Sequence, residues 1–250
     1  MNADLERFGG VARLFGCAAL ESLARAHVAV VGVGGVGSWT VEALARSGVG
    51  RLTLIDMDDV CITNTNRQLP AWEGTVGRPK IAVLAERVRL ISPCCVVEPV
   101  YEFFLENSAE QLLAPEVPYD WIIDAVDRVS IKALLIAKAK ARGIGVVTVG
   151  GAGGRRDATQ IRCGDLAHTG GDALLKQVRR ELRQKYGWPK GERSDWGIPA
   201  IYSAEPQVFC AEPEAGKPQR TGHGSGHGTA SFVTGAFGFA AAGEVVRRLC

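Results

Sequence analysis

Residues 27–56 read HVAVVGVGGVGSWTVEALARSGVGRLTLID, and this stretch decides the fold class. Residues 27–33 and 51–56 are short apolar runs rich in β-branched side chains, which predicts two buried strands. Between them we expect a helix from about 36 to 47. The glycines of GVGGVG at 32–37 fit the pattern G-x-G-x-x-G, which allows a tight turn between the first strand and the helix. The stretch therefore predicts a βαβ unit.

The same alternation continues to residue 150. Helices are predicted at 78–91, where Pro79 suits a first helical turn, and at 131–143, which ends at a glycine. Further strands are predicted at 95–100, 119–126 and 143–150. Strands that alternate with helices imply a parallel sheet with helices on both faces. The predicted fold class is α/β, a Rossmann-like, doubly wound, mainly parallel sheet.

Residues 151–250 have a different composition and form the predicted C-terminal elaboration. A glycine-rich segment precedes a basic amphipathic helix, and a polar loop at 211–228 is expected to be mobile. The apolar run 229–249 is rich in glycine and short for a membrane span, so we expect a buried helix that covers the sheet. The hypothesis is one domain, 1–250, with a nucleotide-binding half at about 1–150 and a substrate-facing half at about 151–250.

Composition excludes several classes of protein. The 250 residues are 46% hydrophobic and 22% charged, enough for one sizeable core, and the net charge of +2 gives weak overall attraction to nucleic acid. No apolar leader follows the N-terminal Met, so a cytoplasmic location and no stable membrane insertion are expected. The seven cysteines form no C-x-x-C pair, which argues against a tetrathiolate zinc site or a disulfide framework.

The glycine turn indicates a phosphate-binding site. Gly32, Gly34 and Gly35 would let the backbone approach phosphates, and the following helix would direct its N-terminal N–H groups at them. Asp56 lies at the end of the second strand, where a carboxylate can accept hydrogen bonds from ribose hydroxyls. Together these features predict a nucleotide site without identifying the nucleotide.

The residues after Asp56 distinguish between nucleotides. Hydride transfer develops little charge on phosphates, so a dinucleotide enzyme has no strong need for Arg67 and Lys80 beside the pocket. Attack of a carboxylate on an α-phosphate builds negative charge on phosphoryl oxygens, which cations and a metal ion stabilise. Arg67 and Lys80 are therefore predicted to bind a triphosphate.

Two acidic residues follow a predicted buried strand in WIIDAVDRV. Ligands of open α/β sheets lie outside the carboxyl ends of the strands, and an acidic residue there can hold Mg²⁺ against phosphates. Asp127 falls beyond the strand and is the better candidate. Asp124 is expected only to cap the following segment.

The motifs in combination resemble those of the ubiquitin-activating-enzyme-like adenylating superfamily, the ThiF/MoeB/HesA group, over about residues 7 to 155. They are G-x-G-x-x-G at 32–37, D-x-D at 56–58, N-x-N-R-Q at 64–68, G-x-P-K at 77–80 and D-x-x-D at 124–127. The resemblance implies binding of ATP and Mg²⁺ and adenylation of a carboxylate.

Site residues follow from the resemblance. It implies catalytic roles for Arg67, Lys80 and Asp127, with Asp127 as the Mg²⁺ ligand. The implied ATP-binding residues are Gly32, Gly34, Gly35, Asp56, Asp58, Asn64, Arg67, Gln68, Lys80 and Asp127. Asn66 is left open between contacting phosphate and bracing the turn that presents Arg67.

The second half resembles the tRNA threonylcarbamoyladenosine dehydratase (TcdA, CsdL) branch of that superfamily, through VTVGGAGGRRDATQIRCGDLAHT and SFVTGAFGFAAA. This implies that ATP adenylates the threonine carboxylate of the modified adenosine, and that a neighbouring nitrogen then closes a ring and releases AMP. A MoeB- or ThiF-like activator of a sulfur-carrier protein is the alternative, disfavoured by the absence of C-x-x-C pairs. An NAD-dependent oxidoreductase would leave Arg67, Lys80 and Asp127 without a role.

The same resemblance implies partners. tRNA is the expected substrate, and residues 176–193, rich in Lys and Arg with Tyr186 and Trp188, are the candidate contact surface. A homodimer is expected, in which Arg7 or Arg13 would reach the partner's phosphates. A cysteine-desulfurase or sulfur-acceptor system is a further candidate partner.

Three residues in or near the polar loop remain without an assigned role. His223 and His227 are four residues apart, but the surrounding glycines argue against a helix that would aim both rings at one metal. Cys210 needs no catalytic role if the attacking nucleophile belongs to the substrate.

Overall fold

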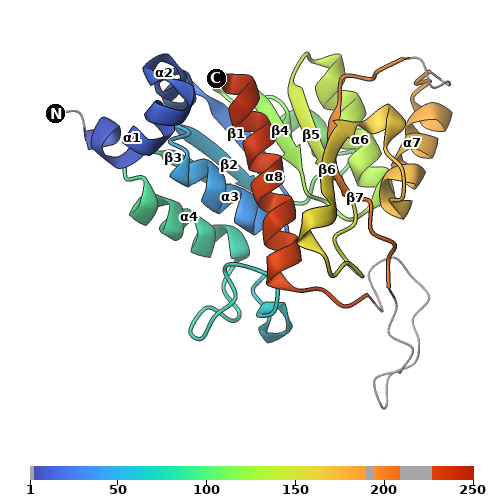
Figure 1. The fold of residues 1–250 in the computed structure, drawn as a ribbon, viewed down its shortest axis with the longest axis horizontal. Coiled ribbons are helices and arrows are strands. Elements are labelled where there is room, and N and C mark those ends of the chain that lie inside the picture. Colours follow the sequence, from blue (N-terminus) through green and yellow to red (C-terminus); the bar gives the residue numbers. More distant parts are fainter. Residues whose placement is uncertain (1–2, 190–193, 209–226) are drawn as a thin grey trace.

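The structure is a computed structural model that describes residues 3–189, 194–208 and 227–250. A seven-stranded sheet in the order β3-β2-β1-β4-β5-β7-β6 forms its centre (Figure 1). Neighbouring strands are parallel except at the edge, where β6 runs antiparallel to β7. The strands are β1 His27–Val31, β2 Arg51–Ile55, β3 Val96–Val100, β4 Trp121–Asp124, β5 Gly145–Val149, β6 Ile161–Asp165 and β7 Pro199–Ser203. The prediction of a Rossmann-like, mainly parallel α/β fold is confirmed.

Helices cover both faces of the sheet (Figure 1). Side chains of α2, α3, α4 and α8 join one core cluster, and those of α5, α6 and α7 join the other. The helices are α1 Ala3–Phe15, α2 Cys17–Arg25, α3 Gly37–Arg46, α4 Lys80–Ile91, α5 Ala109–Leu112, α6 Val129–Ala141, α7 Ala173–Lys185 and α8 Ser231–Leu249, and the 3₁₀ turns are η1 Ile62–Asn64, η2 Ala158–Gln160 and η3 Leu166–His168.

Strand β1 shows why the sequence gives this layered fold. All five of its residues are buried, as expected for a parallel strand with helices on both faces. Val28 and Val30 enter the cluster under α3 and α8, whereas Ala29 and Val31 enter the cluster under α6. Side chains of a strand alternate between faces, so one short apolar run supplies both cores.

The boundary of the first strand differs from the prediction. The first strand ends at Val31 rather than at residue 33, because Gly32 has a φ of 83° and turns the chain out of the sheet. The last apolar run does form one long helix, α8, which lies across the sheet as predicted. Most of the loop predicted to be mobile, 211–228, lies outside the described residues.

The two halves of the chain share the sheet. β5, from the predicted nucleotide-binding half, pairs with β7 through Thr148 with Ala200 and Val149 with Ile201. Within the described ranges, no helix combines the length and apolar character that crossing a membrane requires.

Candidate active site

The glycine turn between β1 and α3 is built so that larger residues do not fit. A Cβ on Gly37 would lie 1.9 Å from the carbonyl oxygen of Gly32, and one on Gly32 would lie 3.0 Å from the carbonyl oxygen of Ala125. Gly32 also needs its positive φ. The turn therefore packs directly on the chain that leaves β4.

A cavity of about 1050 Å³ opens beside this turn, at the carboxyl ends of the central strands. Its volume is at the upper end of the range for small-molecule sites, about 300–1,000 Å³. All the predicted site residues line it: Gly32, Gly34, Gly35, Asp56, Asp58, Asn64, Arg67, Gln68, Lys80 and Asp127. Residues that are far apart in the sequence, from Gly32 to Asp127, thus meet at one cavity.

Asp56 is held by the backbone on both sides of its carboxylate. Its Oδ2 accepts from the N–H of Val33 at 2.8 Å, and its Oδ1 accepts from the N–H of Asp58 at 2.8 Å. Burial raises the pKa of this carboxyl, against the lowering effect of the two N–H donors. Each oxygen keeps lone-pair capacity for a further donor from the cavity.

Lys80 is almost completely buried, with 5% of its side chain exposed, at the start of α4. Its Nζ lies 2.8 Å from Oδ2 of Asp58, whose own side chain is 57% exposed at the cavity. The ammonium of Lys80 is therefore fixed by burial and by Asp58.

The loop that carries Arg67 is tied to the C-terminal part of the chain. Asn66 donates from Nδ2 to the carbonyl of Thr229 at 2.8 Å and accepts from Arg67 Nη1 at 3.0 Å. Trp39 Nε1 and Thr234 Oγ1 donate to the carbonyl of Arg67. Asn66 therefore braces Arg67 in this structure, which favours the bracing role of the two that the sequence left open.

Two further amides of the loop have different environments. Asn64 is buried and its Oδ1 accepts from the N–H of Cys61 at 3.0 Å, which closes the turn η1. Gln68 is also buried, and its Nε2 would lie 3.7 Å from a Cβ on Gly34. Gln68 thus lies directly against the glycine turn, whereas Asn64 uses its carbonyl oxygen to hold the loop.

Asp124 and Asp127 differ completely. Asp124 is fully buried and its Oδ2 lies 2.9 Å from Nζ of Lys132, which is fully buried too. Thr148 of β5 donates to the same oxygen at 2.7 Å. Asp127 is exposed at the cavity and forms no hydrogen bond within the described part of the chain.

Asp127 fits the ligand chemistry of Mg²⁺. This ion takes oxygen ligands, keeps several waters, and is usually held by one or two carboxylates together with substrate phosphates. An exposed carboxylate with free lone pairs, on the same wall as Arg67 and Lys80, offers that kind of ligand. Asp124 does not, because Lys132 and Thr148 already occupy its Oδ2.

Several cavity residues were not predicted. Arg128 lines the cavity beside Asp127, and so do Gln207, His227, residues 150–153 and the first residues of α7. The glycine-rich sequence after β5 was a usable signal, because runs of glycine often mark close backbone approach to a ligand. His223 and Cys210 lie outside the described residues.

The described residues expected to contact RNA or a second copy do not line the cavity, and residues 190–193 of the candidate RNA surface lie outside the described part of the chain. Arg7 donates from Nη1 to the carbonyl of Ile91 at 2.6 Å, and neither Arg7 nor Arg13 lines the cavity. Trp188 packs edge-on against Trp196 with 4.8 Å between ring centroids, and the hydroxyl of Tyr186 is buried. Both rings are partly buried and pack against the core cluster that includes α6 and α7.

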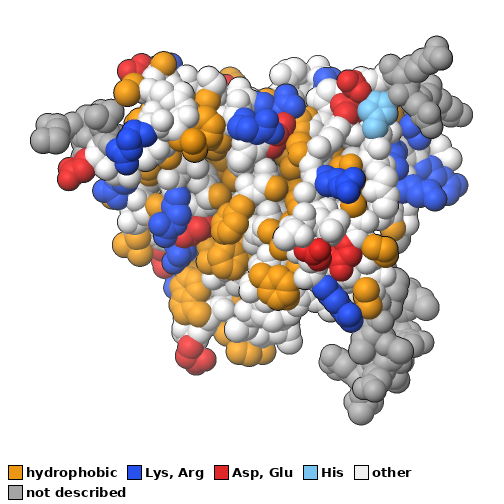
Figure 2. All heavy atoms as spheres, in the orientation of Figure 1, with side chains coloured by type: hydrophobic (Ala, Val, Ile, Leu, Met, Phe, Trp, Pro, Cys, Tyr) orange, Lys and Arg blue, Asp and Glu red, His pale blue; other side chains and the backbone are white. Residues whose placement is uncertain are grey.

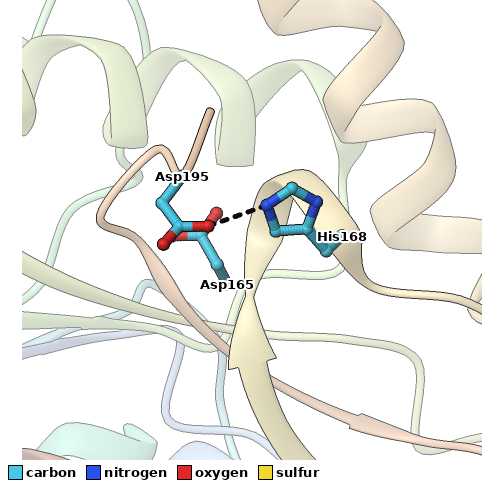
Figure 3. Close-up of side chains that lie close together, drawn as sticks. All are labelled: Asp165, His168 and Asp195. Atoms are coloured by element: carbon cyan, nitrogen blue, oxygen red, sulfur yellow. Dashed lines mark hydrogen bonds and ion pairs between the residues drawn. The ribbon is translucent and has the colours of Figure 1, made fainter. Parts of the chain in front are cut away.

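Among the described residues, one His/acidic cluster has the spacing of a metal site: Asp165, His168 and Asp195 (Figure 3). His168 Nε2 lies 2.8 Å from Oδ1 of Asp195. The carboxylate of Asp165 accepts from four backbone N–H groups, those of Ala167, Trp196, Gly197 and Ile198. Because its lone pairs are already used, Asp165 fastens the end of β6 to the segment before β7, and we assign no metal to the cluster.

An apolar area is exposed on the face covered by α8 (Figure 2). Phe232 and Phe239 of α8 are 62% and 52% exposed, and Phe239 packs edge-on against Trp39 of α3. Large exposed aromatic side chains on one face are typical of a surface that contacts another protein.

Comparisons with known proteins found a matching family model, similar chains and similar structures. The ThiF family model matches residues 10–250. A tRNA threonylcarbamoyladenosine dehydratase of Haemophilus influenzae is 46% identical over 246 residues, which cover 98% of this chain and 93% of that protein. The Escherichia coli enzyme of the same name is 45% identical over 252 residues, again 98% of this chain and 93% of that protein. The crystal structure of that enzyme, TcdA, in complex with ATP has a TM-score of 0.89 and 43% identity, and covers 100% of this chain and 96% of that one.

Proposed function

The chain belongs to the ThiF family, and from this premise we propose that it is an ATP-dependent tRNA threonylcarbamoyladenosine dehydratase. The observation that supports this most is the cavity, which joins the glycine turn with Asp56, Arg67, Lys80 and Asp127 at the strand ends. That set suits attack on an α-phosphate better than hydride transfer, because two cations face the place where phosphoryl charge develops.

The reaction has two steps. The threonine carboxylate of the modified adenosine attacks the α-phosphorus of ATP, and the bond to pyrophosphate breaks. A nitrogen of the same nucleoside then attacks the acyl carbon, loses its proton, and displaces AMP. The net change is loss of one water from the nucleoside, and since nucleophile and electrophile belong to one molecule, proximity replaces an enzyme thiol.

The nucleotide is bound by the fixed part of the wall. Asp56 accepts from the ribose hydroxyls with the oxygen lone pairs that Val33 and Asp58 leave free. The N–H groups of the turn at Gly34 and Gly35 face the phosphates at the N-terminus of α3.

The phosphates are bound by side chains. Arg67 and Lys80 stabilise the developing negative charge, with Lys80 held in place by Asp58. Gln68 and the amide N–H groups of Asn64 add neutral donors from the loop. Mg²⁺, when bound at Asp127, neutralises charge on the phosphate oxygens.

The cavity residues from 150 onward are proposed to receive the modified nucleoside. Residues 150–153, Gln207 and the first residues of α7 line the same cavity as the residues proposed to bind the nucleotide. Gln207 donates to the carbonyl of Gly153 at 2.9 Å, which fixes this part of the lining from within the chain. The proposal of a nucleotide-binding half and a substrate-facing half in one domain rests on these two sets of lining residues.

We extend the proposal to assembly and location. The exposed Phe232 and Phe239 support a homodimer that buries the face covered by α8. Cytoplasmic location suits an enzyme that acts on tRNA, and a sulfur-acceptor partner remains a hypothesis from the resemblance alone.

One experiment tests the activity. The protein is incubated with ATP, Mg²⁺ and total tRNA, and both AMP and the mass of the modified nucleoside are measured. We expect AMP together with loss of one water from threonylcarbamoyladenosine. AMP that forms only after a sulfur-carrier protein is added would favour the carrier-activating alternative, and no AMP with either substrate would reject adenylation.

A further inference from the structure

Lys132 is a fully buried lysine that the proposed chemistry does not use. Its Nζ has three acceptors: Oδ2 of Asp124 at 2.9 Å, the carbonyl of Val126 at 3.0 Å and the carbonyl of Asp124 at 3.1 Å. An ammonium group has three N–H donors, so all three are satisfied. The Lys132 side chain of α6 thus contacts the end of β4, the strand that precedes this helix.

These bonds fix the backbone that leads to Asp127. The carbonyls that Lys132 binds belong to residues 124 and 126, directly before the exposed carboxylate. Asp124 Oδ1 also accepts from the N–H of Val126 at 3.3 Å. From the other side, the turn at Gly32 leaves only 3.0 Å between a Cβ position and the carbonyl of Ala125. Residues 124–126 are therefore held by α6, β5 and the glycine turn together.

Simple packing does not require a charged pair at this place. Burying two charges costs several kcal/mol per ion, and well-packed apolar residues are often as stabilising as a buried ion pair, or more so. An apolar side chain of similar volume would fill the space under α6, but it would leave the buried carbonyl of Asp124 and the part-buried carbonyl of Val126 without this donor. Lys132 therefore does something that an apolar residue of similar volume, such as methionine, cannot do. It holds the backbone that leads to Asp127 in one conformation.

We propose that Lys132 is a positioning residue that directs the Asp127 carboxylate toward Mg²⁺ on the bound ATP. This inference rests on the proposed role of Asp127 as the metal ligand. Residues that orient a metal ligand through hydrogen bonds affect metal affinity by roughly 10- to 100-fold when they are lost.

The variants are chosen to keep the core neutral. Lys132→Met alone would leave the Asp124 charge buried without a partner, so it is combined with Asp124→Asn, and this apolar double variant lacks both charges. Asp124→Asn with Lys132→Gln, the amide double variant, restores neutral N–H donors on a shorter side chain. Lys140→Met is the matched control, because Lys140 is an exposed lysine on the same helix.

The measurements require no RNA. ATP binding is titrated at rising Mg²⁺, AMP binding is measured without metal, and amide hydrogen exchange is followed at residues 125–128. For the apolar double variant we expect about a tenfold increase in the Mg²⁺ needed for half-maximal ATP binding. AMP affinity should stay within about twofold, and exchange at 126–128 should accelerate in the metal-free protein while the interiors of β4 and β5 stay protected.

The amide double variant should recover part of the Mg²⁺ dependence, and Lys140→Met should match the unmodified protein. Thr148→Val is nearly isosteric and removes the other donor to Asp124 Oδ2, so it should shift the Mg²⁺ dependence in the same direction by a smaller factor. A folded apolar double variant, or a Thr148→Val variant, with unchanged Mg²⁺ dependence and unchanged exchange would overturn the inference. Failure of the proposed function appears separately, as absence of AMP from the unmodified protein with tRNA.

Discussion

Asp124 and Asp127 stand three residues apart and do opposite things. Asp124 is fully buried and bound by Lys132 and Thr148, whereas Asp127 is exposed and lines the cavity without a hydrogen bond from the described residues. The end of β4 falls between them, because the strand ends at Asp124. The Asp124 carboxylate therefore stabilises the end of β4, and the Asp127 carboxylate is available to bind a ligand.

The largest effect, on the free energy of unfolding, is expected from replacing the buried residue Asp124. Asp124→Ala leaves the Lys132 ammonium in the core without its counter-charge, which typically costs 3–5 kcal/mol, so we expect about that loss in the free energy of unfolding. Chemical denaturation measures it. Asp127→Ala removes only an exposed side chain. Equal stability of the Asp124→Ala and Asp127→Ala variants would contradict the structural role assigned to Asp124.

Asp127→Ala should lower the rate of AMP formation and leave the stability of the fold unchanged. Loss of a group that stabilises charge in the transition state typically costs a factor of about 100 to 1,000, and we expect at least the lower figure in the rate of AMP formation. The thermal midpoint should match that of the unmodified protein. Glu73→Ala is the control, because Glu73 is another exposed acidic residue that does not line the cavity; equal losses in the two variants would contradict the assignment.

Asn66 extends the comparison to the loop that carries Arg67. Asn66→Ala removes one acceptor of Arg67 Nη1, leaving the carbonyl of Thr63, and removes the bond to Thr229, so we expect roughly a tenfold loss of kcat, or about 1.4 kcal/mol, with ATP affinity nearly unchanged. Thr65→Ala serves as the neighbouring control, since Thr65 bonds only within its own turn. An Asn66→Ala enzyme with full kcat would show that the other contacts of Arg67 are sufficient to position it.

The smallest effect concerns Asp56, which combines burial with access to the cavity. Since burial raises the pKa of its carboxyl, the folded protein takes up this proton at higher pH than the unfolded chain does. Its contribution to stability is therefore fully present below the unfolded pKa and is lost as pH rises through the folded pKa. Nucleotide affinity should change in the opposite sense and weaken on acidification, because a protonated oxygen no longer accepts from ribose.

Calorimetric titration of AMP against pH measures this dependence. The acid limb of the affinity profile should be absent in Asp56→Asn, whose overall affinity is lower. An identical acid limb in both proteins would assign the titration to another group.

The sequence was sufficient for features that depend on local chemistry. The glycine turn requires Gly32 and Gly37 at fixed spacing, and the strand ends bring Asp56 and Asp127 to one edge of the sheet, so these residues could be placed without coordinates. The strand boundary after Val31 was missed by two residues, because a valine beyond the glycine extends the apolar run without extending the strand.

Lys132 could not be predicted in the same way. Its helix has apolar residues on most sides and three lysines, Lys132, Lys138 and Lys140, and a lysine in such a helix is normally exposed. Only the tertiary approach of α6 to the end of β4 buries it against Asp124. Asn66 was ambiguous for a similar reason, since its partner Thr229 lies 163 residues further along the chain.

The position of α8 has a consequence for how the protein is made. This helix, Ser231–Leu249, supplies Val233, Phe237, Ala241 and Val245 to the core cluster on one face of the sheet. It also places Thr234 on the carbonyl of Arg67. During translation the part of that face under α8 stays uncovered, and the Arg67 loop lacks its bond from Thr234, until residues 231–249 have left the ribosome. A nascent chain with β1 to β5 complete therefore exposes apolar surface for the synthesis of about a hundred more residues, and apolar surface exposed in this way promotes aggregation.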